Sequence, residues 1–294
     1  MMSFAPVSLG GREEYLERWA KCPVKTSDYS FGNIWGWAEE YGLEWGFSAT
    51  HVWIRQTRPR VVNWAPIGPW RTPDWAACPV LAGGMELTRV PEELAELWTT
   101  AMPGRVEAVE VREHFDYVYS VPELTALRGN RFHKKKNLLN QFLKTYRHDF
   151  SDLTPDCVEA TLDMQRQWYT WRDSEDPGTL LAENRAITRV LQNWDRLGGG
   201  LFGGVLRVEG EVAAYTVAEA LSDEMLVIHF EKGRPEFKGV YQAVNQMFLA
   251  RYGQGFALVN REQDLGDEGL RKAKMSYNPV RFLKKFAVTV HPRE

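Results

Sequence analysis

The sequence is poor in cysteine and contains no long apolar run. Its three cysteines, Cys22, Cys78 and Cys157, are far apart and form no Cys-x-x-Cys pair. This pattern excludes a disulfide framework and indicates a reducing compartment, so we expect a cytoplasmic protein. No window approaches the roughly 18 apolar residues that a membrane-spanning helix needs, and the N-terminus lacks the basic and apolar regions of a signal peptide. We therefore expect neither secretion nor membrane insertion.

Several catalytic signatures are also missing. The six histidines form no His-x-x-x-His pair and no Cys/His metal spacing, so we expect no metal site. The sequence has no Gly-x-Ser-x-Gly elbow, no Walker loop and no dinucleotide fingerprint after a strand. The formal net charge of −3 argues against a protein that covers nucleic acid with its whole surface, although a local basic patch remains compatible with it.

What the chain does contain is ample material for a core. Hydrophobic residues make up 44% of its 294 residues, which suits one large or two medium domains. Most of the 12 tryptophans lie between Trp19 and Trp75. We interpret them as core residues, with a stacking platform for bases as the alternative. Strand patterns at 51–55, 60–65 and 105–111, together with a helix that begins near Pro91, predict a mixed α/β first third.

The middle of the chain is basic. Between Leu127 and His148 no acidic residue occurs, while apolar residues recur at helical spacing, which predicts an amphipathic helix with a basic face. Two interpretations stay open. The helix is either a solvated connector between domains or a wall that binds the phosphates of a nucleotide or of tRNA. The binding candidates on it are Arg131, Lys134, Lys135, Lys136 and Asn137.

The remaining residues follow a definite order of elements. Helices are predicted at 155–172 and 179–197, a hairpin at 201–208 and 212–220, and a strand from Met225. A helix at 239–252, a strand at 256–259, a charged helix from Asp264 and a closing strand at 282–290 complete the order of an N-acetyltransferase-like domain. In its strand–helix–strand unit, a helix N-terminus and strand ends meet, and backbone N–H groups there can receive an anion or a reacting carbonyl. We predict the site at this point.

Three segments carry a family resemblance: 30–37, 129–137 and, above all, 260–274 with Ser276 to Pro279. They resemble a bacterial family known as domain of unknown function 2156, which is related to the C-terminal catalytic domain of phosphatidylglycerol lysyltransferase. The resemblance implies an α/β (α+β, mixed-sheet) fold of tandem GCN5-related N-acetyltransferase-like lobes, similar to Fem-type and lysyl-phosphatidylglycerol synthase catalytic domains. We expect an N-terminal lobe at 1–126, a basic connecting helix at 127–150 and a C-terminal lobe with the site at 151–294.

Candidate catalytic residues come from two segments. Asp264 and Asp267 begin the charged helix, where they either cap it or act as a general base, while Arg271 and Lys274 on the same stripe hold a phosphate or an oxyanion. His229 and Glu231 are two positions apart in one strand, so we expect their side chains on the same face. Either the two act together as a general base for an incoming amine, or His229 is an ordinary core histidine. Tyr277 is the candidate acid for the leaving group. The donor candidates here are Lys238, Gly239, Tyr241 and Asn260.

These features predict an acyl- or aminoacyltransferase that acts on a soluble amine or hydroxyl, carried by a small molecule or a peptide. No cysteine or serine has a recognisable activating partner, so we expect direct attack without a covalent enzyme intermediate. The donor is aminoacyl-tRNA or acyl-CoA. Residues 236–241 align poorly with a pyrophosphate loop because Glu236 and Tyr241 replace its usual residues. The alternative is a non-catalytic protein of the same fold that binds nucleotide or RNA.

Overall fold

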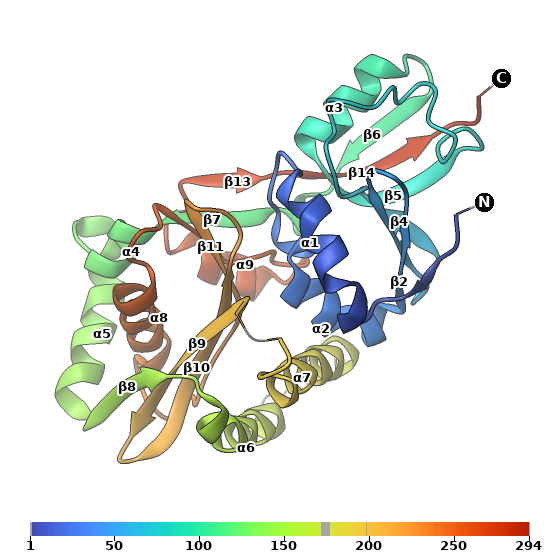
Figure 1. The fold of residues 1–294 in the computed structure, drawn as a ribbon. Coiled ribbons are helices and arrows are strands. Elements are labelled where there is room, and N and C mark those ends of the chain that lie inside the picture. The colour runs from blue at the N-terminus through green and yellow to red at the C-terminus, as the bar shows by residue number, and fades with distance from the viewer. Residues whose placement is uncertain (1, 172–176, 198, 294) are drawn as a thin grey trace. The chain divides into compact units, whose positions relative to one another are not determined.

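The chain forms two compact units in a computed structural model that describes residues 2–171, 177–197 and 199–293. The first unit comprises Met1–Asp116, Gln263–Glu268 and Phe282–Glu294, and the second comprises Tyr117–Glu262 and Gly269–Arg281. Each unit is built on a seven-stranded mixed sheet (Figure 1). The chain therefore crosses between the units several times along its length.

The sheet of the first unit contains one parallel pair. Its order is β1 (Ala5–Pro6), β2 (Leu43–Phe47), β3 (Val52–Gln56), β4 (Val62–Trp64), β5 (Met85–Pro91), β14 (Lys285–Val290) and β6 (Val106–Glu110). Strands β4 and β5 are parallel, and the other neighbours are antiparallel. The α-helices of this unit are α1 (Arg12–Ala20), α2 (Phe31–Tyr41) and α3 (Glu92–Ala101), with short 3-10 turns at Leu9–Gly11, Ser27–Tyr29 and Arg112–His114.

The tryptophans of the first unit are core residues, as predicted. Trp64, Trp70, Trp75 and Trp98 are each at most 3% exposed. Buried indole N–H groups need acceptors, and Trp70 donates to the Pro66 carbonyl at 2.9 Å while Trp75 donates to the Trp70 carbonyl at 2.7 Å. All four add volume to this core and Trp70 and Trp75 add hydrogen bonds, whereas the indole N–H of Trp98 is buried without a partner among the described residues.

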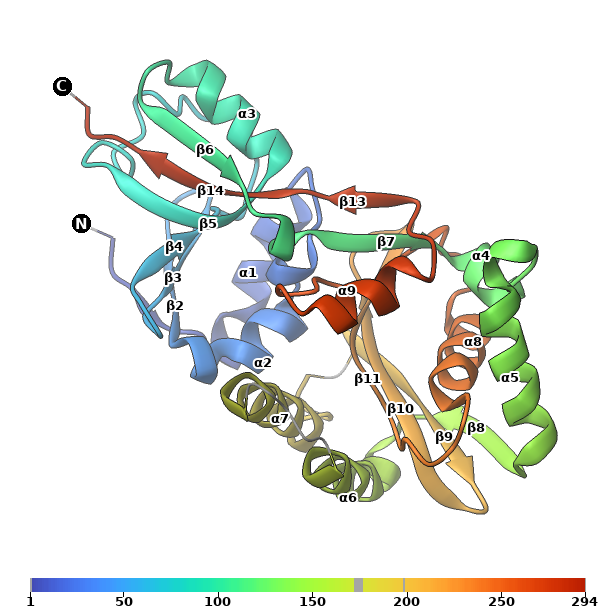
Figure 2. The same cartoon turned by 180° about the vertical axis from the view of Figure 1, so that it is seen from behind.

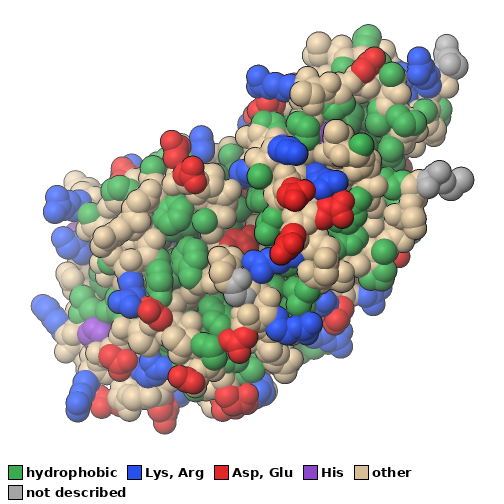
Figure 3. All heavy atoms as spheres, in the orientation of Figure 1, with side chains coloured by type: hydrophobic (Ala, Val, Ile, Leu, Met, Phe, Trp, Pro, Cys, Tyr) green, Lys and Arg blue, Asp and Glu red, His purple; other side chains and the backbone are tan. Residues whose placement is uncertain are grey.

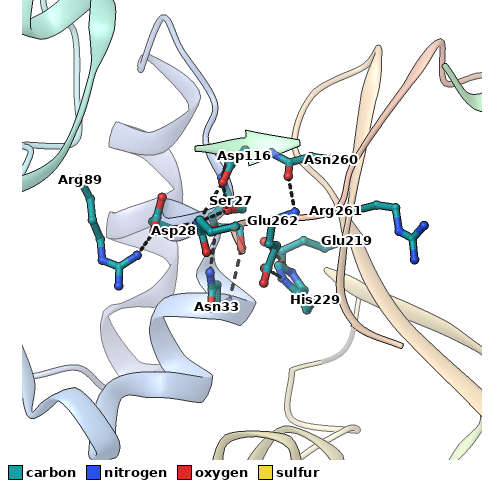
Figure 4. A network of polar contacts seen from close by, with 12 residues as sticks. Ser27, Asp28, Asn33, Arg89, Asp116, Glu219, His229, Asn260, Arg261 and Glu262 are labelled. Atoms are coloured by element: carbon teal, nitrogen blue, oxygen red, sulfur yellow. Dashed lines mark hydrogen bonds and ion pairs between the residues drawn. The ribbon is translucent and has the colours of Figure 1, made fainter. Parts of the chain in front are cut away.

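A buried ionic network holds the C-terminal strand in the first unit. Lys285 of β14 is fully buried and bonds the carboxylates of Asp28 and Asp116, and Arg89 also bonds Asp28. Figure 4 shows Asp28, Arg89 and Asp116. Burial acts to raise the pKa of Asp28, but the charges of Lys285 and Arg89 outweigh it and lower that pKa. Gln263 donates to Asp116 at 2.8 Å, so the network joins five separate stretches of sequence.

The sheet of the second unit also contains a parallel pair. Its order is β13 (Arg281–Leu283), β7 (Asp116–Ser120), β12 (Leu258–Asn260), β11 (Met225–Gly233), β10 (Glu211–Ala220), β9 (Leu201–Val208) and β8 (His148–Asp152). The parallel pair is β11 and β12, and the β7–β12, β11–β10, β10–β9 and β9–β8 pairs are antiparallel. The hairpin between β9 and β10 turns at Glu209 and Gly210, both with positive φ, as a two-residue turn requires.

Helices cover both faces of this second sheet. Figures 1 and 2 show α4 (Val121–Ala126), α5 (His133–Thr145) and α8 (Val240–Tyr252) on one face, and α6 (Pro155–Trp171) and α7 (Pro177–Gln192) on the other. The 3-10 turn Asn130–Phe132 leads into α5, and α9 (Glu268–Met275) follows β12. No helix in the described ranges is long and apolar enough to cross a membrane.

The observed units differ from the three consecutive segments expected from the sequence. The basic helix α5 lies within the second unit, and the strand at 282–290, expected to close the second lobe, instead lies between β5 and β6 of the first unit. Alternating hydrophobicity identifies a strand, but it does not select the partner strand. The partner is decided by the burial of Val288, Val290 and the paired Lys285 against residues of the first unit.

Candidate functional site

The second unit has an irregularity at the middle of β11. Ala218 of β10 is paired with Ile228, whereas the preceding Val217 is paired with Phe230, so His229 is an extra residue in β11. Such a bulge bends the strand and turns its side chains away from regular alternation. The prediction that His229 and Glu231 share one face assumed regular alternation, and the two side chains in fact have different partners.

His229 lies between two carboxylates. Its Nδ1 is 2.9 Å from Oε1 of Glu262, and its Nε2 is 3.8 Å from Oε1 of Glu219 (Figure 4). Burial acts to lower the pKa of His229, but the hydrogen bonds and charges of Glu219 and Glu262 outweigh it and raise the pKa to about 9. The imidazole is therefore protonated at neutral pH. In that state it cannot accept a proton from an incoming amine.

The residues after β12 supply the partners of β11. Asn260 ends the strand, and its side-chain oxygen accepts from the backbone N–H of Glu262 at 2.8 Å, which shapes the turn in which Glu262 has a φ of 57°. Arg261 bonds Oε1 of Glu231 at 2.8 Å, while the other oxygen of Glu231 accepts from Asn245 of α8 at 3.0 Å. Two consecutive side chains, those of Arg261 and Glu262, thus contact Glu231 and His229 of β11.

Tyr277 lies beside Arg261. The Arg261 guanidinium is 4.9 Å from the centre of the Tyr277 ring, and Lys135 of α5 is 4.1 Å from it. The Tyr277 hydroxyl accepts from Gln242 of α8 at 3.0 Å. Burial raises the pKa of Tyr277 and outweighs the lowering effect of Arg261, so the phenol keeps its proton at neutral pH. A protonated phenol held in this way is suited to donate a proton to a leaving oxygen.

The N-terminus of α8 is closed by the chain itself. Lys238 N–H donates to the Tyr146 hydroxyl at 3.3 Å, and the amides of Arg234, Phe237 and Val240 donate to backbone carbonyls. Gly239 has a φ of 90°, and a Cβ there would lie 2.3 Å from the Leu138 carbonyl of α5. A pyrophosphate binds such a loop through unpaired amides. The amides of Phe237, Lys238 and Val240 are already paired here, and Gly239 lies against α5.

Asp264 and Asp267 belong to the first unit. Asp264 is fully buried, forms an ion pair with Arg112 at 3.3 Å and accepts from Gly266 N–H at 2.9 Å. Asp267 is exposed, and its N–H donates to the Asp264 carbonyl. Because α9 begins only at Glu268, these two acids shape the loop before the helix. A catalytic part for them stays a prediction.

The other predicted residues are spread over the second unit. Lys274 of α9 donates to the Arg261 carbonyl at 2.6 Å, and Tyr241 accepts from Trp168 at 3.1 Å. Arg131 forms an ion pair with Glu123, Asn137 is near His133, and Lys134 and Lys136 are exposed. Arg271 of α9 is partly exposed. The described residues contain no group of histidine, cysteine and acidic side chains that could hold a metal ion.

The sequence did not single out four residues that contact His229, Glu231 or Tyr277: Glu219, Gln242, Arg261 and Glu262. Arg261 and Glu262 directly follow Asn260 in the segment with the strongest family resemblance, so that segment was an available signal. Glu219 is brought to His229 by the pairing of β10 with β11. Strand pairing of this kind cannot be read from one sequence.

Known proteins share this architecture over nearly the whole chain. A conserved protein of unknown function from Bacteroides thetaiotaomicron superposes with a TM-score of 0.87 at 28% identity, covering 99% of this chain and 100% of that one. The C-terminal domain (DUF2156) of a protein from Agrobacterium fabrum, named as a lysylphosphatidylglycerol synthetase, gives 0.63 at 12% identity, with 94% and 91% covered. FemX gives 0.56 at 7% identity, with 97% of each chain covered. The predicted tandem acetyltransferase-like fold is confirmed.

The sequence comparison agrees with the fold. An uncharacterized protein of Mycoplasmoides gallisepticum is 26% identical over 181 residues, which is 60% of this chain and 56% of that protein, so the match spans about half the length of this relative. The family model described as "Phosphatidylglycerol lysyltransferase, C-terminal" matches residues 19–289. The chain therefore belongs to the family of phosphatidylglycerol lysyltransferase C-terminal domains.

Proposed function

We propose that this protein transfers an aminoacyl group from aminoacyl-tRNA to a soluble amine or hydroxyl. The family and its lysyltransferase name support a transferase. The observation that carries the choice of donor is the closed N-terminus of α8. Acyl-CoA would need unpaired amides in this loop, and those of Phe237, Lys238 and Val240 already donate to Tyr146 or to backbone carbonyls. This favours a donor that is bound by other means.

The surface of α5 supports a polyanionic donor. Three lysines stand in the first turns of the helix, and its first turn contains no acid. Cations at a helix N-terminus oppose the helix dipole, whereas an anion there is stabilised. Lys134 and Lys136 are exposed and form no ion pair within the described residues. Figure 3 shows lysine and arginine side chains along the left edge, where α5 lies in Figure 1. The phosphate groups of a nucleic-acid backbone would neutralise the positive charge of this face of α5.

The chemistry is assigned to residues of the second unit. Attack by the acceptor on the ester carbonyl of the donor breaks the bond to the tRNA 3′ oxygen, and Tyr277 gives that oxygen a proton. Gln242 holds the Tyr277 hydroxyl at 3.0 Å. Glu231 forms an ion pair with Arg261 and fixes the guanidinium. Because His229 is protonated, the acceptor loses its proton to solvent or to another group.

Donor choice is tested with purified protein. Thermal unfolding is followed with acetyl-CoA, CoA, uncharged tRNA and aminoacyl-tRNA, since a ligand at a hundred times its Kd stabilises by about 2.7 kcal/mol. Stabilisation is expected with tRNA and not with CoA. Transfer is then followed as loss of labelled amino acid from tRNA in the presence of a set of amines and polyols. Saturable stabilisation by CoA together with acetylation of an amine would overturn the proposal.

A matched pair of variants tests the basic face. Lys134→Glu reverses one charge on α5, and Lys21→Glu reverses one exposed charge in the first unit. We expect Lys134→Glu to weaken tRNA binding about tenfold at low salt and to lower the salt dependence of binding, and Lys21→Glu to change neither. Equal effects of both variants would show that only the net charge matters.

A further inference from the structure

One cluster of the second unit contains two cations and one carboxylate. Lys135 and Arg261 both lie against the ring of Tyr277, at 4.1 Å and 4.9 Å from its centre. Glu231 forms an ion pair with Arg261 at 2.8 Å. Lys135 has no carboxylate partner within the described residues. The cluster therefore has an excess positive charge in a half-buried place, where charge is costly unless it is compensated.

One donor of this cluster is buried without an acceptor. Nη1 of Arg261 is inaccessible to solvent and has no hydrogen-bond partner in the described part of the chain. Buried donors are satisfied in nearly all proteins, so such a group needs an explanation. Burial lowers the pKa of Lys135, and the charge of Arg261 lowers it further. A bound anion that reaches both cations would relieve both penalties at once.

The geometry suits a phosphate group. A guanidinium presents a planar fork to a phosphate oxygen pair, an ammonium supplies a point charge, and the Tyr277 hydroxyl provides a neutral donor. We propose that Arg261, Lys135 and Tyr277 form a phosphate-binding subsite. Only the source of the phosphate rests on the proposed function: it belongs either to the 3′-terminal nucleotides of the donor or to a phosphorylated acceptor.

The test uses the full-length protein and isothermal calorimetry with inorganic phosphate, adenosine 5′-monophosphate and glycerol 3-phosphate as probes. Lys135→Gln is compared with Lys136→Gln, which makes the same change at the exposed neighbouring position. We expect Lys135→Gln to weaken phosphate binding by about tenfold or more, and Lys136→Gln to weaken it less than about twofold. Tyr277→Phe should weaken it by a smaller factor. Tighter binding of adenosine 5′-monophosphate would identify the donor nucleotides as the source of the phosphate, and tighter binding of glycerol 3-phosphate would identify a phosphorylated acceptor.

A second variant distinguishes loss of phosphate binding from loss of folding. Arg261→Gln alone would leave Glu231 buried and unpaired, so it is combined with Glu231→Gln, which removes the pair together. This double variant should keep a cooperative unfolding transition and bind no phosphate. Equal weakening by Lys135→Gln and Lys136→Gln, or no saturable binding to the wild type, would overturn the subsite. Saturable, Lys135-dependent binding without aminoacyl transfer would leave the subsite in place and refute the proposed function.

Discussion

The protonated state of His229 allows a quantitative prediction. Its pKa rises from 6.5 to about 9 in the folded protein because Glu219 and Glu262 outweigh the effect of burial. At 1.36 kcal/mol for each pKa unit, the shift corresponds to about 3 kcal/mol of folding free energy. A raised pKa means that the folded state holds the proton more tightly. The contribution is therefore complete below pH 6.5 and disappears as the pH rises through 9.

The direct measurement is an NMR titration of the histidine ring signals. The signal absent from the spectrum of His229→Gln belongs to His229, and it is expected to titrate near pH 9. Urea unfolding at several pH values gives the second readout. The variant should lose about 3 kcal/mol at pH 6, and this loss should shrink towards pH 10. His133→Gln, at the exposed start of α5, is the control. If the His229 signal titrated near 6.5, the argument from the two carboxylates would be wrong.

Three further predictions follow from named contacts. Lys285→Met removes the buried cation that Asp28 and Asp116 share, while Arg89 still pairs with Asp28, and should cost about 3–5 kcal/mol in urea unfolding at pH 7. Little change would mean that water enters the network. Gly239→Ala should destabilise the protein by more than Gly129→Ala. Both positions have positive φ, but of the two only Gly239 is crowded, by the Leu138 carbonyl. Equal losses of unfolding free energy would contradict the close contact of Gly239 with α5. Tyr277→Phe should lower single-turnover aminoacyl transfer by about a hundredfold or more while tRNA binding stays within about twofold, and an unchanged rate would exclude Tyr277 as the proton donor.

Local elements were largely predictable, because their signals are local. The hairpin turn at Glu209 and Gly210 follows from glycine chemistry, and the helices at 155–171 and 240–252 follow from apolar spacing. The strands β2, β5, β7 and β8 were not predicted. Short strands carry weak patterns, and their existence depends on the partners with which they pair.

The site was only partly predictable for the same reason. Tyr277, Glu231 and Lys135 were singled out from the sequence. The structure places Glu231 and Tyr277 against Arg261, and Lys135 against Tyr277. Their actual roles depend on distances that no spacing contains. His229 is the extra residue of a bulge and has two carboxylate neighbours, and Leu138 of α5 and Tyr146 contact the loop before α8.

The sequence by itself determined the type of each major helix and of most strands, the tryptophan-rich core and, through its motifs, the family. Only the tertiary structure decided which strand completes which sheet, which carboxylates face which cations, and where a positive charge is left uncompensated. The physical reason is that helix and turn formation depends on neighbours along the chain, whereas pKa values and ion pairs depend on neighbours in space. Lys285 shows the difference most clearly: it lies in a basic pair near the C-terminus, yet it is fully buried between two aspartates that precede it by more than a hundred residues.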